Sequence, residues 1–159
     1  MIPAFLSAHG ILDLAIEKER RRRIFYAIAS ELGTNADMKA LFHFLAEEED
    51  RHIDIFLQIR NSLSAETEEE NWGDKSAYLD AIHDDRLYSK MDSREFVQLA
   101  VDNWNAFRLA IGFEKDAILF FTEFLPHLSE ENSRIVRGLI AEEKGHIQRL
   151  VEVMEQIGE

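Results

Sequence analysis

Apolar residues recur at three- and four-residue steps along most of the chain, which is the spacing that places side chains on one face of an α-helix. The alternating runs rich in Val, Ile and Thr that are typical of strands are missing, and only two prolines and seven glycines occur. The sequence therefore predicts an all-α protein.

Turn-forming residues divide this pattern into helices. Gly33 is predicted to end the first helix in a left-handed conformation, and Thr34 or Asn35 to cap the second. Pro126 is predicted to close the last helix but one. The predicted helices cover about 7–32, 35–62, 93–102, 104–125 and 130–157.

Residues 64–92 differ from the segments on either side. They start with a polar run and contain one short amphipathic stretch, about 76–84, that predicts a small extra helix. A connection of about thirty residues is long enough to travel the length of a bundle and return the chain to its starting end. We therefore expect a single domain with two helical hairpins, about 7–63 and about 93–157, joined by a long crossover.

Length, charge and cysteine content narrow the functional class. A chain of 159 residues fits one domain, and its formal charge of −13 argues against a nucleic-acid partner. The absence of cysteine excludes disulfides, thiolate metal sites and iron–sulfur clusters, so any metal must be bound by oxygen and nitrogen. The N-terminus lacks a secretory signal and no long apolar run occurs, so we expect a soluble cytoplasmic protein with no membrane contact.

The two predicted hairpins repeat one pattern. Residues 15–19 match residues 110–114 at an offset of 95, and residues 48–53 match residues 142–147 at an offset of 94. Each hairpin therefore carries a glutamate on its first helix and Glu-x-x-His on its second.

The four repeated glutamates are expected to meet at one depth of a four-helix bundle. They lie about twelve to fifteen residues from the turn of their own hairpin, which at about 1.5 Å per residue places them in one layer roughly 20 Å from the hairpin ends. A glutamate and a histidine three residues apart share a helix face and form a chelating pair. The predicted metal ligands are Glu19, Glu49, His52, Glu114, Glu143 and His146.

Charge balance indicates what this layer binds. Four buried carboxylates would each carry a desolvation penalty of several kcal/mol unless cations balanced them. Two divalent ions balance four carboxylates, and the two histidines add neutral ligands. Such a set suits redox chemistry of iron with oxygen species, although Mn and Zn also accept carboxylate and imidazole ligands.

The residues around these ligands resemble the rubrerythrin branch of the ferritin-like di-iron carboxylate proteins. The resemblance covers nearly the whole chain and rests on Glu19 with Phe25 and Tyr26, and on residues 42–52 and 140–146. It implies a ferritin-like antiparallel four-helix bundle and two iron ions per chain. It also implies that Glu49 and Glu143 bridge the ions, with Glu19 and His52 completing one end and Glu114 and His146 the other.

Two departures from that family affect the expected activity. Rubrerythrins add a cysteine-ligated iron domain that passes electrons to the di-iron centre, whereas this chain has no cysteine, so peroxide reduction would need an external electron donor. They also carry an extra glutamate at the position of Ala117, and its absence favours a symmetric site with six ligands.

The resemblance implies an oxidoreductase that reacts with peroxide, oxygen or Fe(II). Two other functions stay open, namely a non-catalytic module that stores, buffers or senses iron or zinc, and a helical interaction protein with an incidental polar core. A homodimer is expected, because dimers are common among such bundles.

Several further side chains receive an interpretation from their position. Tyr26 is a hydrogen-bond donor or radical relay near the metal layer, or a packing residue. In the run of four arginines, Arg22 or Arg23 points toward the bundle and pairs with a carboxylate, or the run forms a solvated face or a dimer contact. Trp72 and Trp104 are interpreted as packing residues. The glutamates interpreted as solvent-facing charges are Glu17, Glu47, Glu48 and Glu142. The histidines interpreted as ordinary surface or boundary residues are His9, His43, His83 and His127.

Overall fold

The described chain folds into four long helices and two shorter elements. The computed structural model describes residues 8–63 and 90–158. Its elements are α1 (Ala8–Leu32), α2 (Ala36–Ser62), α4 (Arg94–Asp102), α5 (Ala106–Phe124), the 3₁₀ turn η1 (Leu125–His127) and α6 (Glu130–Gln156). The all-α prediction is confirmed, and the predicted helix at 76–84 and the interpretation of Trp72 and His83 lie outside the described residues.

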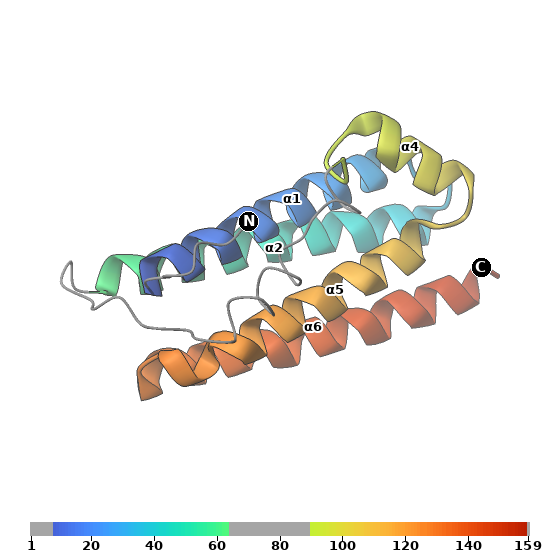
Figure 1. Cartoon of the computed structure of the whole chain (residues 1–159). Coiled ribbons are helices and arrows are strands. Elements are labelled where there is room, and N and C mark those ends of the chain that lie inside the picture. Colours follow the sequence, from blue (N-terminus) through green and yellow to red (C-terminus); the bar gives the residue numbers. More distant parts are fainter. Residues whose placement is uncertain (1–7, 64–89, 159) are drawn as a thin grey trace.

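The four long helices form a bundle of two hairpins (Figure 1). Within each hairpin the helices are antiparallel, and α1 also packs against α5 while α2 packs against α6. The last turn of α2 and the first turn of α4 lie at opposite ends of the bundle (Figure 1). The predicted return of the chain along the bundle is therefore consistent with the positions of these helices. None of the described helices combines the length and the apolar character that crossing a bilayer requires.

Side-chain caps explain where three of the helices begin. The Asn35 side chain accepts hydrogen bonds from the backbone N–H groups of Asp37 and Met38 at the start of α2. The Ser93 hydroxyl accepts one from Phe96 at the start of α4, and Ser129 accepts one from Asn132 at the start of α6. Each cap satisfies a backbone donor that has no partner within its own helix.

Two predictions are wrong, one for the conformation of Gly33 and one for the packing of Trp104. Gly33 follows α1 as predicted, but its φ is not positive. A Cβ at Gly33 would lie 3.1 Å from the carbonyl oxygen of Ala29 and 3.0 Å from Cγ of Lys39, so this position is crowded rather than left-handed. Trp104 lies in the turn between α4 and α5 with φ of 58° and is 64% exposed, so it does not pack in the core.

The core consists of two apolar clusters with a polar layer between them. One cluster contains Phe56, Phe120, Phe121 and Phe124, and the other contains Phe25 and neighbouring aromatic residues. Along every long helix, the stretch that holds the repeated glutamate separates the two clusters. Apolar side chains therefore cover the polar layer on both sides along the bundle axis. The bundle thereby isolates a small polar volume from both of its ends.

Candidate metal centre

The structure brings all six predicted donor residues into the polar layer. Each of the four long helices supplies one glutamate, and α2 and α6 each add a histidine. Five of the six side chains are completely inaccessible and the sixth, His146, is 4% exposed. The six residues are Glu19 on α1, Glu49 and His52 on α2, Glu114 on α5, and Glu143 and His146 on α6.

Their donor atoms form two adjoining groups. One group contains Glu19, Glu49, His52 and Glu143, and the other contains Glu114, Glu143 and His146. Within each group one donor atom per residue lies within 4.8 Å of all the others. Because Glu143 belongs to both groups, the cluster has the composition of a dinuclear site with a shared carboxylate.

The two imidazoles face this cluster through the same ring nitrogen. Nδ1 of His52 lies 2.9 Å from Oε1 of Glu143 and 3.8 Å from Oε2 of Glu19. Nδ1 of His146 lies 3.1 Å from Oε2 of Glu143 and 3.8 Å from Oε1 of Glu114. The two rings are nearly parallel, with centroids 6.0 Å apart. The histidines are therefore equivalent in orientation as well as in sequence.

Within the described residues, the cluster leaves several buried polar atoms without a hydrogen bond. Five carboxylate oxygens of the four glutamates are in this state, and so is Nδ1 of His52, whose 2.9 Å contact with Oε1 of Glu143 is an ion pair without hydrogen-bond geometry. An unsatisfied buried polar atom is costly, and such atoms are uncommon in folded proteins. Here they converge on one volume, and carboxylate oxygens with imidazole nitrogens are a donor set for divalent transition metals. The residues present thus fit a dinuclear metal site.

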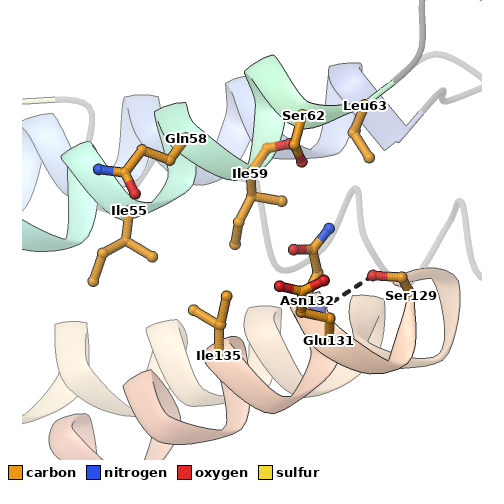
Figure 2. A pocket seen from close by; sticks show the side chains of 9 residues that line it. All are labelled: Ile55, Gln58, Ile59, Ser62, Leu63, Ser129, Glu131, Asn132 and Ile135. Carbon is orange, nitrogen blue, oxygen red and sulfur yellow. Dashed lines mark hydrogen bonds between the residues drawn. The ribbon is translucent and has the colours of Figure 1, made fainter.

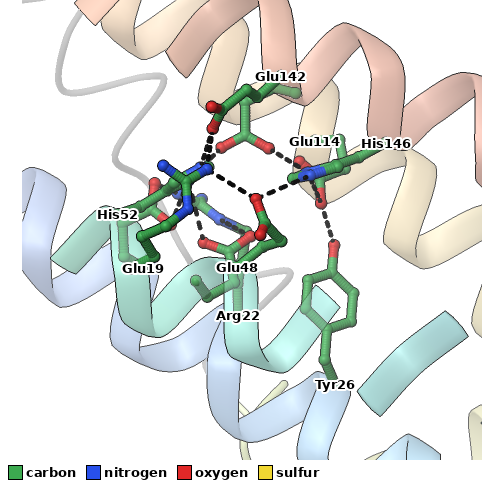
Figure 3. A network of polar contacts seen from close by, with 11 residues as sticks. Glu19, Arg22, Tyr26, Glu48, His52, Glu114, Glu142 and His146 are labelled. Atoms are coloured by element: carbon green, nitrogen blue, oxygen red, sulfur yellow. Dashed lines mark hydrogen bonds and ion pairs between the residues drawn. The ribbon is translucent and has the colours of Figure 1, made fainter. Parts of the chain in front are cut away.

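Two further glutamates support the histidines, and the sequence interpretation of them was wrong. Oε2 of Glu142 lies 2.9 Å from Nε2 of His52, and Oε2 of Glu48 lies 3.7 Å from Nε2 of His146. Both are partly buried instead of solvent-facing. Each pair joins α2 to α6 (Figure 3). Arg51 bonds to both glutamates. Glu142 is within hydrogen-bond distance of His52, and a carboxylate so placed fixes the ring orientation and makes the inner nitrogen a better ligand, whereas the contact of Glu48 with His146 is a longer ion pair.

The repeat contained a signal for these two residues. The full repeated unit is Glu-Glu-x-x-His. The first glutamate of each unit lies beside the apolar stripe of its own helix, and this position alone predicts a solvent-facing side chain. Glu17 and Glu47, which stand outside that unit, are exposed as predicted.

One arginine and one tyrosine enter the layer from α1. Arg22 is 3% exposed, and its Nη2 donates to Oε1 of Glu19 at 2.7 Å. The Tyr26 hydroxyl is completely buried and donates to Oε1 of Glu114 at 2.7 Å (Figure 3). The expectation that one of the four arginines points inward is therefore met by Arg22, whereas Arg23 pairs with Asp50 at the surface.

Burial and mutual contact change the ionisation of these groups. Burial lowers the pKa of His52 and of His146, but the carboxylates facing them outweigh it and raise the pKa to about 11 and about 9 respectively. Burial and the charge of Glu143 raise the pKa of Glu114, while contacts with Glu114 and both histidines overcome burial and hold the pKa of Glu143 low. Without metal, the imidazoles are therefore protonated near neutral pH and counter the carboxylates.

A shallow groove between α2 and α6 leads to this layer from outside. Glu48, Arg51, Glu142, Gly145 and His146 line it. A separate pocket lies near the end of α2 and the start of α6 (Figure 2). Four of its nine lining residues are aliphatic and four are polar without charge, and Glu131 is the one ionisable side chain among them, so these described residues offer no second metal-binding group.

A scan against protein-family models and a search of curated proteins gave no match. Among solved structures, the chain is similar to a candidate ferritin-like diiron-carboxylate protein from Thermotoga maritima, with a TM-score of 0.70. The fold is ferritin-like. The similarity covers 97% of this chain and 98% of the other at 22% sequence identity, so it confirms the predicted bundle. The assignment of ligands in this ferritin-like bundle rests on its own geometry.

The raised pKa values predict how the stability of the metal-free protein depends on pH. Protonated His52 and His146 stabilise the fold fully below the ordinary histidine pKa of 6.5, and this contribution declines as pH rises toward about 9 and about 11. From pH 7 to 9 each histidine should lose about 2 kcal/mol, so we expect a combined loss on the order of 4 kcal/mol, or roughly 12 °C in Tm. Thermal unfolding in the presence of a chelator measures it, with His146→Gln giving a shallower decline. A Tm that stays constant or rises over this interval contradicts the prediction.

Proposed function

We propose that this chain is a non-haem di-iron protein whose paired ions react with peroxide, oxygen or Fe(II). The observation that carries the proposal is the convergence of four buried carboxylates and two imidazoles, with five carboxylate oxygens lacking a hydrogen bond. The known fold adds support, because ferritin-like bundles place glutamate and Glu-x-x-His ligands on facing helices.

The ligands would be divided between two ions. Glu19 and His52 would complete one end and Glu114 and His146 the other, with Glu49 and Glu143 between them. Glu143 already belongs to both donor groups, which supports its bridging role. Bound iron would supply electrons to an oxidant by changing between its ferrous and ferric states, whereas Mn or Zn would occupy the same ligands with different reactivity.

The remaining residues of the layer would orient ligands, carry protons and exclude water. Glu142 and Glu48 would hold the outer nitrogens of the two histidines, so that Nδ1 of each ring stays directed at the ions. The Tyr26 hydroxyl holds a proton 2.7 Å from Glu114, where it would restrain that carboxylate and could donate to it. The aromatic clusters on both sides would keep bulk water from the layer.

The functional class that we propose is the rubrerythrin-like branch, and these 159 residues contain no cysteine that could ligate an electron-transfer iron. Arg22 occupies the repeat position equivalent to Ala117, so neither half carries the additional glutamate of that branch. This supports a site with six ligands. An external electron donor would then be required if the oxidant is peroxide. The cytoplasmic location and the homodimer belong to the same proposal.

Metal content tests the ligand assignment. Wild-type protein loaded anaerobically with Fe(II) is expected to hold about two ions per chain, and Glu49→Ala is expected to hold almost none, because it removes a ligand proposed to serve both ions. Glu47→Ala is the matched control on the same helix, since that side chain is 68% exposed. Elemental analysis after desalting measures the content. Equal iron content in the two variants would overturn the assignment.

Turnover distinguishes an oxidoreductase from a store or sensor. Iron-loaded wild-type protein is expected to consume peroxide or oxygen at least about tenfold faster than the same concentration of free Fe(II), since ligand geometry is fixed before reaction. Stopped-flow absorption of the ferric product measures the rate. A protein that holds two ions yet reacts no faster than free iron is a storage, buffering or sensing module.

The support that Glu142 gives to His52 is tested separately. Glu142→Gln replaces the charged acceptor at 2.9 Å by a neutral group of similar size, so we expect roughly a 10- to 100-fold loss of metal affinity. Glu155→Gln, on the exposed surface of α6, is the control. Competition with a metallochromic chelator measures both affinities, and unchanged affinity in Glu142→Gln would remove this residue from the centre.

A further inference from the structure

The two ends of the polar layer have matching ligands but different surroundings. Residues three positions after the α1 and α5 glutamates are equivalent in the repeat, and they are Arg22 and Ala117. The residues seven positions after those glutamates are Tyr26 and Phe121, which are also equivalent. The repeat therefore preserves all six ligands and changes the groups that contact them.

Arg22 gives the end of the layer that contains Glu19 and His52 a permanent positive charge. Arg22 is 3% exposed, its Nη2 lies 2.7 Å from Oε1 of Glu19, and its Nε lies 3.8 Å from Oε1 of Glu49. A guanidinium stays protonated at any pH a protein encounters, so its charge does not depend on the state of its neighbours. Both glutamates that it contacts belong to the donor group containing His52.

The opposite end receives a neutral donor, which also comes from α1. Glu114 accepts a hydrogen bond from the Tyr26 hydroxyl at 2.7 Å, and Ala117 brings no charge. One oxygen of Glu19 and one oxygen of Glu114 remain without a hydrogen bond, so each carboxylate has one oxygen free to bind an ion. These two carboxylates therefore offer the same number of free oxygens, and they differ in the charge of the α1 side chain that contacts them.

We propose that Arg22 makes the two metal positions unequal, so that the first ion binds at the end completed by Glu114 and His146 and the second binds more weakly at the end completed by Glu19 and His52. This inference rests on the proposed dinuclear centre. A divalent ion beside Glu19 and Glu49 is repelled by the guanidinium, and it shares both carboxylates with it. Arg22 is thus a positioning residue that sets the order of loading, and the weaker position holds the more readily exchanged ion.

The access route agrees with this order. The groove between α2 and α6 is lined by His146 and by Glu48, whose carboxylate lies 3.7 Å from Nε2 of His146. Two arginines, Arg51 and Arg149, line it together with the carboxylates, and His52 is not part of its lining. An ion that enters through the groove therefore reaches the proposed stronger position first.

Calorimetric titration of metal-free protein with Co(II), combined with the visible absorption of bound Co(II), tests the proposal without any measurement of activity. Wild-type protein is expected to bind two ions in steps whose affinities differ by roughly tenfold or more. Arg22→Met removes the charge at similar length, so the second step should strengthen and the difference should shrink to about threefold or less. Arg22→Lys retains the charge and should preserve most of the difference.

Single-ligand variants assign the order even if Arg22→Met does not fold. His52→Ala should lose the weak step and retain the tight one, whereas His146→Ala should lose the tight step. Equal affinities in the wild type, the reverse assignment of the steps, or an unchanged difference in folded Arg22→Met would each overturn the role of Arg22 while leaving a dinuclear centre in place. Failure of the wild type to bind two Co(II) ions would instead refute the proposed centre itself.

Discussion

Compensation of charge inside one buried layer is the constraint on which the rest of the structure depends. Four carboxyl groups lie there out of contact with solvent, and isolated charges in such a place would each cost several kcal/mol. The chain supplies counter-charges of its own, namely Arg22 and two imidazoles whose pKa values lie above neutrality. The metal-free fold therefore has its own charge compensation, and an ion entering the proposed centre would replace protons on the histidines rather than fill an uncompensated site.

The helices that carry this layer are held together by the layer as well as by the apolar clusters. Glu142 with His52, and Glu48 with His146, each connect α2 of the first hairpin to α6 of the second. Arg51 contacts both of these glutamates at the surface. The same contacts that orient the imidazoles thus fix one hairpin against the other, so the geometry of the centre and the packing of the bundle cannot be varied independently.

Helix positions and the depth of the donor layer were predictable because both follow from local periodicity and from a repeat within the chain. Glu19, Glu49, Glu114 and Glu143 could be placed at one level by counting residues from two turns. Glu48 and Glu142 were misplaced because the stripe of a single helix does not reveal how far a neighbouring helix covers its edge. Gly33 and Trp104 were misjudged for a related reason, since backbone conformation at a turn depends on the elements that the turn connects.

The internal repeat explains why the centre has two similar halves, and its departures explain why those halves need not act alike. A charge argument from ligands alone balances four glutamates with two divalent ions, and it omits the guanidinium that accompanies them. Including Arg22 leaves the fully loaded layer with one excess positive charge, located beside Glu19 and Glu49. At the opposite end, the group from α1 that contacts Glu114 is the neutral Tyr26 hydroxyl. The excess positive charge therefore affects one ligand set more than the other, although the ligands themselves are matched. A repeat that conserves ligands while changing their neighbours can therefore assign different tasks to two metal positions without altering the ligands themselves.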